Sequence, residues 1–126
     1  MSKHAVLLTL SALTLVALQT GCGDKSNSLT YQADVKPILD ANCVSCHTAG
    51  NPGYEKSGLR LDSYDALMKG TQYGPVIVPG SSVSSTLYRL VSGQADPSIR
   101  MPHGKAALSD DDVSTIAAWI DQGAKN

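Results

Sequence analysis

The stretch of sequence that decides the fold is CVSCH at residues 43–47. Two cysteines three residues apart, followed directly by a histidine, form the attachment signature of c-type haem. Residues three and four apart share one face of a helix, so Cys43, Cys46 and His47 could all face one flat ligand. The thiols would form thioether bonds to the haem, and the imidazole would bind its iron. The motif therefore predicts one covalently attached haem c.

Other uses of these two cysteines are less well supported. A zinc site would need a second pair of ligands, and only His4 and His103 remain outside the motif. A thioredoxin-like redox pair usually accompanies a βαβ pattern, which does not precede residues 43–47. A disulfide between Cys43 and Cys46 stays open if the compartment is oxidising.

Residues 1–21 resemble an export signal. A short basic start precedes an apolar run from Ala5 to Leu18, which is shorter than the roughly 20 residues of a membrane-spanning helix. A cleaved signal fits this pattern, and its end resembles a bacterial lipoprotein processing site. We therefore expect lipidation of Cys22, with ordinary cleavage nearby as the alternative. This predicts a protein of the periplasm or cell envelope, held at a membrane through Cys22.

The rest of the chain has room for one domain. Residues 22–29 are polar and predict a flexible tether, and residues 30–126 predict the domain itself. The whole chain has 10 Lys and Arg and 11 Asp and Glu, of which residues 1–21 contribute only Lys3. No basic stripe indicates a nucleic-acid partner, and no acidic block indicates disorder.

The domain is predicted to be helical. Capping residues and apolar stripes indicate four helices, at about residues 34–42, 63–69, 83–92 and 109–123. Asp34, Ser63 and Ser109 are the expected N-caps, and Pro37 is expected in the first turn of its helix. Residues 48–53 predict a loop, and residues 73–79 predict an extended segment packed on the core.

Apolar residues show which helical faces should be buried. In the third helix, the expected face comprises Val83, Leu87, Leu90 and Val91. In the last helix, it comprises Val113, Ile116, Ala117 and Ile120, with Trp119 beside it. The chain contains no Phe and one Trp, so a covalently held apolar cofactor would fill out an otherwise small core.

The iron needs a sixth ligand, and three side chains could supply it. Met68 lies in a predicted helix, where a methionine typically packs in the core. Met101 lies in a loop directly before Pro102, which restricts the backbone beside it. A thioether binds Fe(II) and raises the reduction potential, so Met101 is the favoured ligand. His103 is two residues away and stays open as a replacement, although an exposed loop position is the simpler expectation for it.

An ordered set of short motifs over residues 31–124 resembles the c-type cytochrome domain of planctomycete-type bacterial proteins. The matching pieces are DVKPIL (34–39), CVSCH (43–47), GLRLDS (58–63), VPG (78–80), RMP (100–102) and WIDQGA (119–124). The resemblance implies an all-α, class I cytochrome c-like fold of about four helices around one haem. It also places the axial roles on His47 and Met101.

We therefore predict a monohaem electron carrier, rather than an enzyme, that exchanges single electrons with transiently docked redox partner proteins. Arg60 and Arg100 are candidates to pair with the haem propionates, because arginine binds carboxylates bidentately. One alternative is a haem enzyme or sensor, such as a peroxidase-like protein, which would need an open iron position. Another is a haem subunit of a larger envelope oxidoreductase complex.

Overall fold

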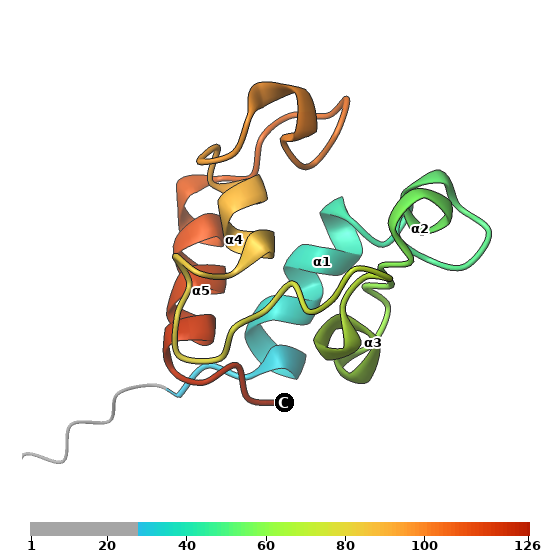
Figure 1. Cartoon of the computed structure of the whole chain (residues 1–126). Helices are drawn as coiled ribbons and strands as arrows, with labels where there is room; N and C mark the ends of the chain where they lie inside the picture. The colour runs from blue at the N-terminus through green and yellow to red at the C-terminus, as the bar shows by residue number, and fades with distance from the viewer. Residues whose placement is uncertain (1–27) are drawn as a thin grey trace, which may run out of the picture.

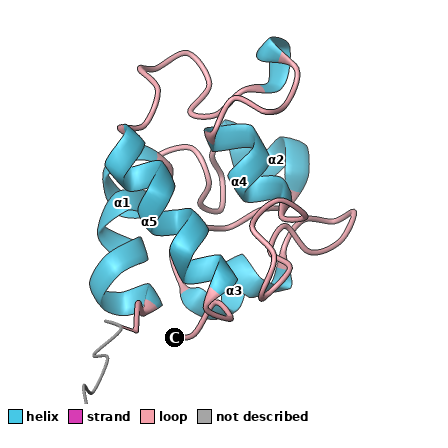
Figure 2. Cartoon of the chain, turned by 90° about the vertical axis from the view of Figure 1, so that its left-hand side faces the viewer, coloured by secondary structure: helices cyan, strands magenta, loops and turns pink. Residues whose placement is uncertain are grey.

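The computed structural model describes residues 28–126, so the predicted signal, Cys22 and most of the tether lie outside the described residues. The described part consists of helices and loops without a β-strand (Figures 1 and 2). Its elements are η1 (Tyr31–Val35), α1 (Lys36–Asn42), α2 (Pro52–Ser57), α3 (Tyr64–Lys69), α4 (Thr86–Val91), η2 (Pro97–Ile99) and α5 (Asp110–Asp121). The all-α prediction is confirmed, with five α-helices within residues 28–126 where about four were expected.

The N-terminal helix begins one turn earlier than predicted. Thr30 is its N-cap, because the Thr30 hydroxyl accepts a hydrogen bond from the Ala33 amide at 3.2 Å. Asp34, the expected cap, instead binds back to the Thr30 amide at 2.7 Å, a reciprocal arrangement that satisfies two amides of the first turn. Pro37 lies in the first turn of α1, as predicted. It follows a π-helical turn in which the Lys36 amide donates to the Tyr31 carbonyl oxygen.

The loop predicted at residues 48–53 ends earlier than expected, because α2 begins at Pro52. Proline suits the first turn of a helix, where its missing N–H has no partner to lose. Gly58 ends α2 in the left-handed conformation, with φ at 71°. The next helix was predicted correctly: the Ser63 hydroxyl caps α3 by accepting from the Ala66 amide at 3.3 Å, and Gly70 follows its last residue.

Helix α4 is shorter than predicted because Ser85 holds the preceding residues in a turn. The buried Ser85 hydroxyl accepts from the Val78 amide at 2.8 Å and donates to the Ser81 carbonyl oxygen at 2.9 Å. Val83 therefore lies outside the helix and is 67% exposed, so its place on the buried face is wrong. Leu87 and Val91 are buried as predicted.

Helix α5 forms as predicted and organises the core. The Ser109 hydroxyl caps it by accepting from the Asp112 amide at 3.1 Å. Three aspartates lie in its first turn, where their negative charges interact favourably with the positive end of the helix dipole. Ile116, Trp119 and Ile120 are fully buried. The helix packs against η1 and α4 (Figure 1).

The two ends of the described chain are tied together. The Lys125 carbonyl oxygen accepts from the Tyr31 amide at 2.9 Å and from the Trp119 indole at 2.7 Å. The Tyr64 hydroxyl donates to the Ala124 carbonyl oxygen at 2.9 Å. Tyr31 packs edge-on against Tyr64, with ring centroids 5.5 Å apart. These contacts close the end of the domain that is remote from the CVSCH motif.

The segment before α4 also packs as expected. Val76 and Ile77 are buried, whereas Val78 is partly exposed. Within residues 28–126, no helix has the length and apolar character needed to cross a membrane.

The closing contact of Tyr64 can be tested with a matched pair of tyrosines. Tyr64→Phe removes the hydrogen bond to Ala124 and should lower the free energy of unfolding by about 1 kcal/mol. Tyr73→Phe makes the same chemical change at a side chain that is 85% exposed and should leave stability unchanged. Urea unfolding of the two variants, followed by circular dichroism, measures both. Equal stability of the variants would contradict the role given to Tyr64.

Candidate haem site

The CVSCH motif forms a hydrogen-bonded turn immediately after α1, rather than part of a regular helix. The amides of Cys46 and His47 both donate to the Cys43 carbonyl oxygen, at 3.1 and 3.0 Å. The spacing of three and four residues that the chemistry requires is therefore kept within one turn. Cys43 is buried against the core, Cys46 is exposed, and both are free thiols rather than a disulfide.

Burial affects the reactivity of the first thiol. Desolvation raises the pKa of Cys43 to about 11; the nearby Lys105 opposes this shift, and Cys46 adds to it. At neutral pH the Cys43 thiol is therefore protonated in the structure described here.

The segment after α2 holds His47 from two directions. The His47 carbonyl oxygen accepts from the Leu61 amide at 2.9 Å. The His47 Nδ1 lies 3.4 Å from the Leu59 carbonyl oxygen. A carbonyl oxygen can only accept, so Nδ1 carries the proton and Nε2 keeps its lone pair. This is the tautomer that an axial iron ligand needs, with its orientation set by a backbone acceptor.

The electrostatic environment of His47 favours the same state. The side chain is half-buried, and desolvation lowers its pKa, while the hydrogen bond to Leu59 opposes the shift. The imidazole is therefore neutral at pH 7, as metal binding requires.

The close approach of Gly53 to the His47 ring shows how the chain accommodates this imidazole. A Cβ atom at Gly53 would lie 2.9 Å from both Cε1 and Nε2 of His47 and 2.8 Å from the Cys46 carbonyl oxygen. Real Cβ atoms do not approach other atoms this closely, so only glycine leaves room for the ring at this place in α2. The chain thus forms a cradle around the imidazole from Gly53 on one side and Leu59 on another. The motif and its surroundings fit a haem c.

Met101 lies on the distal loop, residues 92–108, which connects α4 to α5. It is half-buried and packs against the core, and its amide donates to the Leu90 carbonyl oxygen at 3.1 Å. His103 is an exposed residue of the same loop, as expected for a loop histidine. Met68 packs against the core, also as expected.

One contact joins the distal loop to the motif, and sequence reasoning missed it. The Lys105 ammonium donates to the Ser45 hydroxyl at 3.0 Å, across 60 residues of chain. Ser45 is one of the two variable positions of CVSCH, and a lone loop lysine carries no signal that would have indicated this partner.

The two predicted arginines lie apart from each other. Arg60 pairs with Asp62 at 2.6 Å, and this contact lowers the pKa of the Asp62 carboxyl. Arg100 is exposed and lines a hollow of about 220 Å³ in the distal loop, together with His103 and Lys105. A pairing of either arginine with a haem propionate stays a prediction. Within residues 28–126, no cluster of three or more His, Cys, Asp or Glu side chains suggests a separate metal ion site.

Comparison with known proteins supports the assignment of residues 43–47 as a haem c site. Residues 43–103 match the model of the planctomycete cytochrome C family. This match and the cytochrome c6 relative described below support a c-type cytochrome domain in the chain. Members of such families hold haem c covalently, and Cys43 and Cys46 have the required spacing.

Two curated relatives and one solved structure extend the comparison of this cytochrome domain. It is 28% identical to cytochrome c6 from Picosynechococcus sp. over 116 residues, covering 91% of the chain and 92% of that protein. It is 27% identical over 129 residues to the hydrazine synthase subunit alpha of Kuenenia stuttgartiensis, covering 81% of the chain. The chain spans only 16% of the length of that subunit.

The solved structure supports the fold alone. Kuenenia stuttgartiensis hydrazine synthase superposes with a TM-score of 0.53 at 22% identity, over 76% of this chain and 16% of that one. The small helical cytochrome fold is therefore confirmed. The family match and the cytochrome c6 relative, independently of this structure, support haem-based electron transfer by an extracytoplasmic domain.

The Gly53 cradle gives a testable consequence. Gly53→Ala forces its methyl group against the His47 ring and the Cys46 backbone, so we expect a loss of about 1–3 kcal/mol in stability and a lower yield of haem-loaded protein. Pro52→Ala, at the exposed neighbouring position, is the control and should load haem normally. Haem absorbance per mole of protein and chemical unfolding measure the two effects. Normal loading and stability in Gly53→Ala would contradict the cradle.

Proposed function

We propose that this protein is a monohaem carrier of single electrons, with the iron bound between His47 and Met101. The observation that carries the proposal is the constraint on His47, whose Nδ1 is directed to the Leu59 carbonyl oxygen at 3.4 Å. This leaves Nε2 as the metal-binding atom. When bound, the haem supplies an iron that cycles between Fe(III) and Fe(II).

The role of the polypeptide in this chemistry is to fix the positions of the iron ligands. The hydrogen bonds of residues 59–61 fix the imidazole, and the anchoring of Met101 to Leu90 holds the distal loop against α4. Rigid ligands keep the geometry similar in the two oxidation states, so little reorganisation accompanies each transfer. The link between Lys105 and Ser45 adds a second fixed point to the distal loop.

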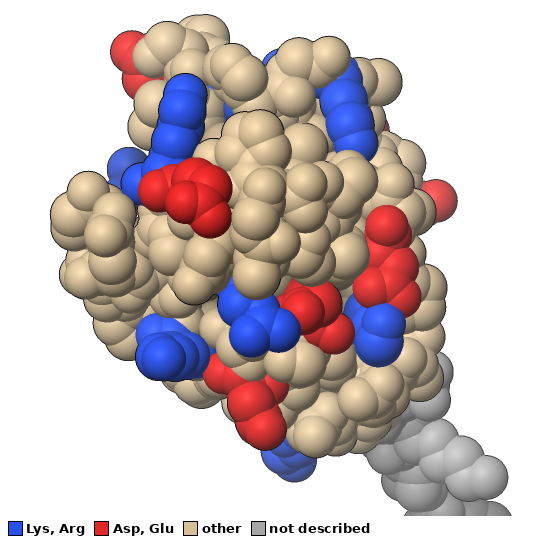
Figure 3. Space-filling model, turned by 90° about the vertical axis from the view of Figure 1, so that its right-hand side faces the viewer, with Lys and Arg blue, Asp and Glu red and all other residues tan. Residues whose placement is uncertain are grey.

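The surface suits brief docking with redox partners. Acidic and basic side chains are interspersed on the face shown in Figure 3, around a broad area of uncharged side chains. Transient redox complexes typically bury less than about 1,200 Å². A small, mixed surface of this kind permits association without tight binding.

Iron ligation by Met101 gives the sharpest test. Met101→Ala should abolish the weak far-red sulfur-to-iron absorption band of the oxidised protein and lower its reduction potential markedly, because a good thioether ligand for Fe(II) is lost. His103→Ala, two residues away on the same loop, should keep both properties. Optical spectra and redox titration of the two purified variants decide the matter. A band that persists in Met101→Ala, or disappears in His103→Ala, would exclude the assignment.

A second candidate role is a haem subunit of a larger oxidoreductase complex. The match to part of the hydrazine synthase subunit alpha favours it, since the chain there corresponds to a small share of a much longer protein. Co-purification of a larger oxidoreductase with the tagged chain from its native host would support this role. Rapid binding of carbon monoxide, or peroxide turnover, would instead favour a haem enzyme or sensor.

We further propose that Cys22 carries a lipid that anchors the domain to a membrane of the cell envelope. Several acyl chains on one cysteine would give a stable anchor, at about 0.8 kcal/mol per buried CH₂ group. Cys22→Ala should therefore shift the haem protein from the membrane fraction to the soluble fraction of lysed cells. Immunoblots of the two fractions measure the shift, and an unchanged distribution would contradict lipidation.

A further inference from the structure

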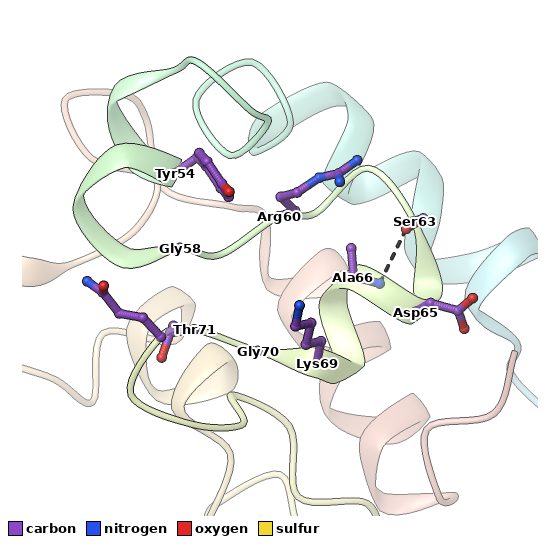
Figure 4. A pocket seen from close by; sticks show the side chains of 10 residues that line it. Tyr54, Gly58, Arg60, Ser63, Asp65, Ala66, Lys69, Gly70 and Thr71 are labelled. Atoms are coloured by element: carbon purple, nitrogen blue, oxygen red, sulfur yellow. Dashed lines mark hydrogen bonds between the residues drawn. The ribbon is translucent and has the colours of Figure 1, made fainter.

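A polar hollow of about 610 Å³ lies between α2, residues 58–60, α3 and the turn at residues 70–72 (Figure 4). None of Cys43, Cys46, His47 and Met101 lines it. The residues proposed to attach the haem and to bind its iron therefore lie outside this hollow.

Backbone packing fixes the shape of this hollow. The Gln72 amide donates to the Ser57 carbonyl oxygen at 2.9 Å, and its side-chain amide donates to the Lys56 carbonyl oxygen at 3.3 Å. These bonds join the turn to the last residues of α2. Gly58 forms part of the wall, and a Cβ there would lie 3.2 Å from the Gln72 nitrogen. A side chain at Gly58 would thus push the turn away, so the wall depends on glycine.

The groups directed into the hollow are hydrogen-bond donors. Lys69 and Tyr54 point into the space, whereas the Asp65 carboxylate points away from it (Figure 4). The Lys69 side chain is exposed and the Tyr54 side chain is half-buried. Within residues 28–126 the ion pairs are Lys36–Asp40 and Arg60–Asp62, so no carboxylate pairs with Lys69. The guanidinium of Arg60, on the rim, is already paired with Asp62. An ammonium and a phenol that face the same space suit an anionic group.

The size and the apolar parts of the lining indicate more than a bare ion. A hollow of about 610 Å³ exceeds the needs of an inorganic anion. The ring of Tyr54 and the methyl group of Ala66 add apolar surface beside the donors. We propose that this hollow binds a small organic anion, a carboxylate or a phosphate ester, whose charged group accepts hydrogen bonds from Lys69 and Tyr54.

The segment of residues 59–61 connects the hollow to His47. Leu59 and Leu61 are buried and Arg60 is exposed, the alternation of an extended segment. The backbone of this segment binds His47 through Leu59 and Leu61, while Arg60 borders the hollow. A bound anion would therefore lie across one extended segment from the imidazole. Its negative charge favours Fe(III) over Fe(II) and lowers the reduction potential; this consequence, unlike binding itself, rests on the proposed ligation by His47.

The test uses the reduced, haem-loaded protein and phenyl phosphate as the probe. Amide NMR shifts over residues 54–72 should change saturably with phenyl phosphate. Lys69→Gln should weaken binding at least about tenfold, the loss expected when a charge-assisted hydrogen bond is removed. Lys56→Gln, which removes a lysine of α2 that does not line the hollow, should leave the affinity unchanged. Phenol, the neutral counterpart, should bind at least about tenfold more weakly.

Each other outcome overturns a stated part of the proposal. Absence of saturable shifts, or equal affinity in the Lys69 and Lys56 variants, would exclude the anion site. Inorganic phosphate that binds as tightly as phenyl phosphate would exclude recognition of the organic part. A reduction potential that does not fall at saturation would exclude the coupling to His47. The NMR binding measurements do not depend on Met101 or on electron transfer. They therefore test the anion site separately from the proposed function.

Discussion

The carbonyl oxygen of Leu59, directed at Nδ1 of His47, is the contact on which the site depends. It selects the imidazole tautomer, leaves Nε2 for a metal and sets the direction of the ring. The Leu61 amide holds the His47 backbone at the same time, and Gly53 keeps the other side of the ring clear. The fold supports this arrangement from a distance, because the core of α5, Tyr31 and Tyr64 fixes the elements from which these residues project.

Much of the fold could be predicted from the sequence because the signals are local. Ser63 and Ser109 are N-caps, and each is followed by an apolar pattern that repeats with the period of a helix. The CVSCH motif likewise carries its chemistry within five residues. In such cases one or two turns of chain contain all the groups involved, so no knowledge of the tertiary structure is required.

The errors arise where a distant contact or an ambiguous residue decides the outcome. Pro52 and Gly53 predict a loop when taken alone, yet the proline starts α2 and the glycine leaves room for a histidine six residues earlier. Val83 fits a helical stripe, but the hydrogen bonds of the buried Ser85 hold it in an exposed turn. The roles of Leu59 and Lys105 depend on backbone and hydroxyl groups brought together by folding, which no local pattern indicates.

We propose that one haem c is held by residues 43–47 and that its iron cycles by one electron without changing its ligands. The most direct measurement is an optical redox titration of the purified, haem-loaded protein. We expect a single reversible one-electron transition, with low-spin, six-coordinate spectra in both oxidation states. A protein without covalently bound haem, or a reduced form that is high-spin and five-coordinate, would contradict it.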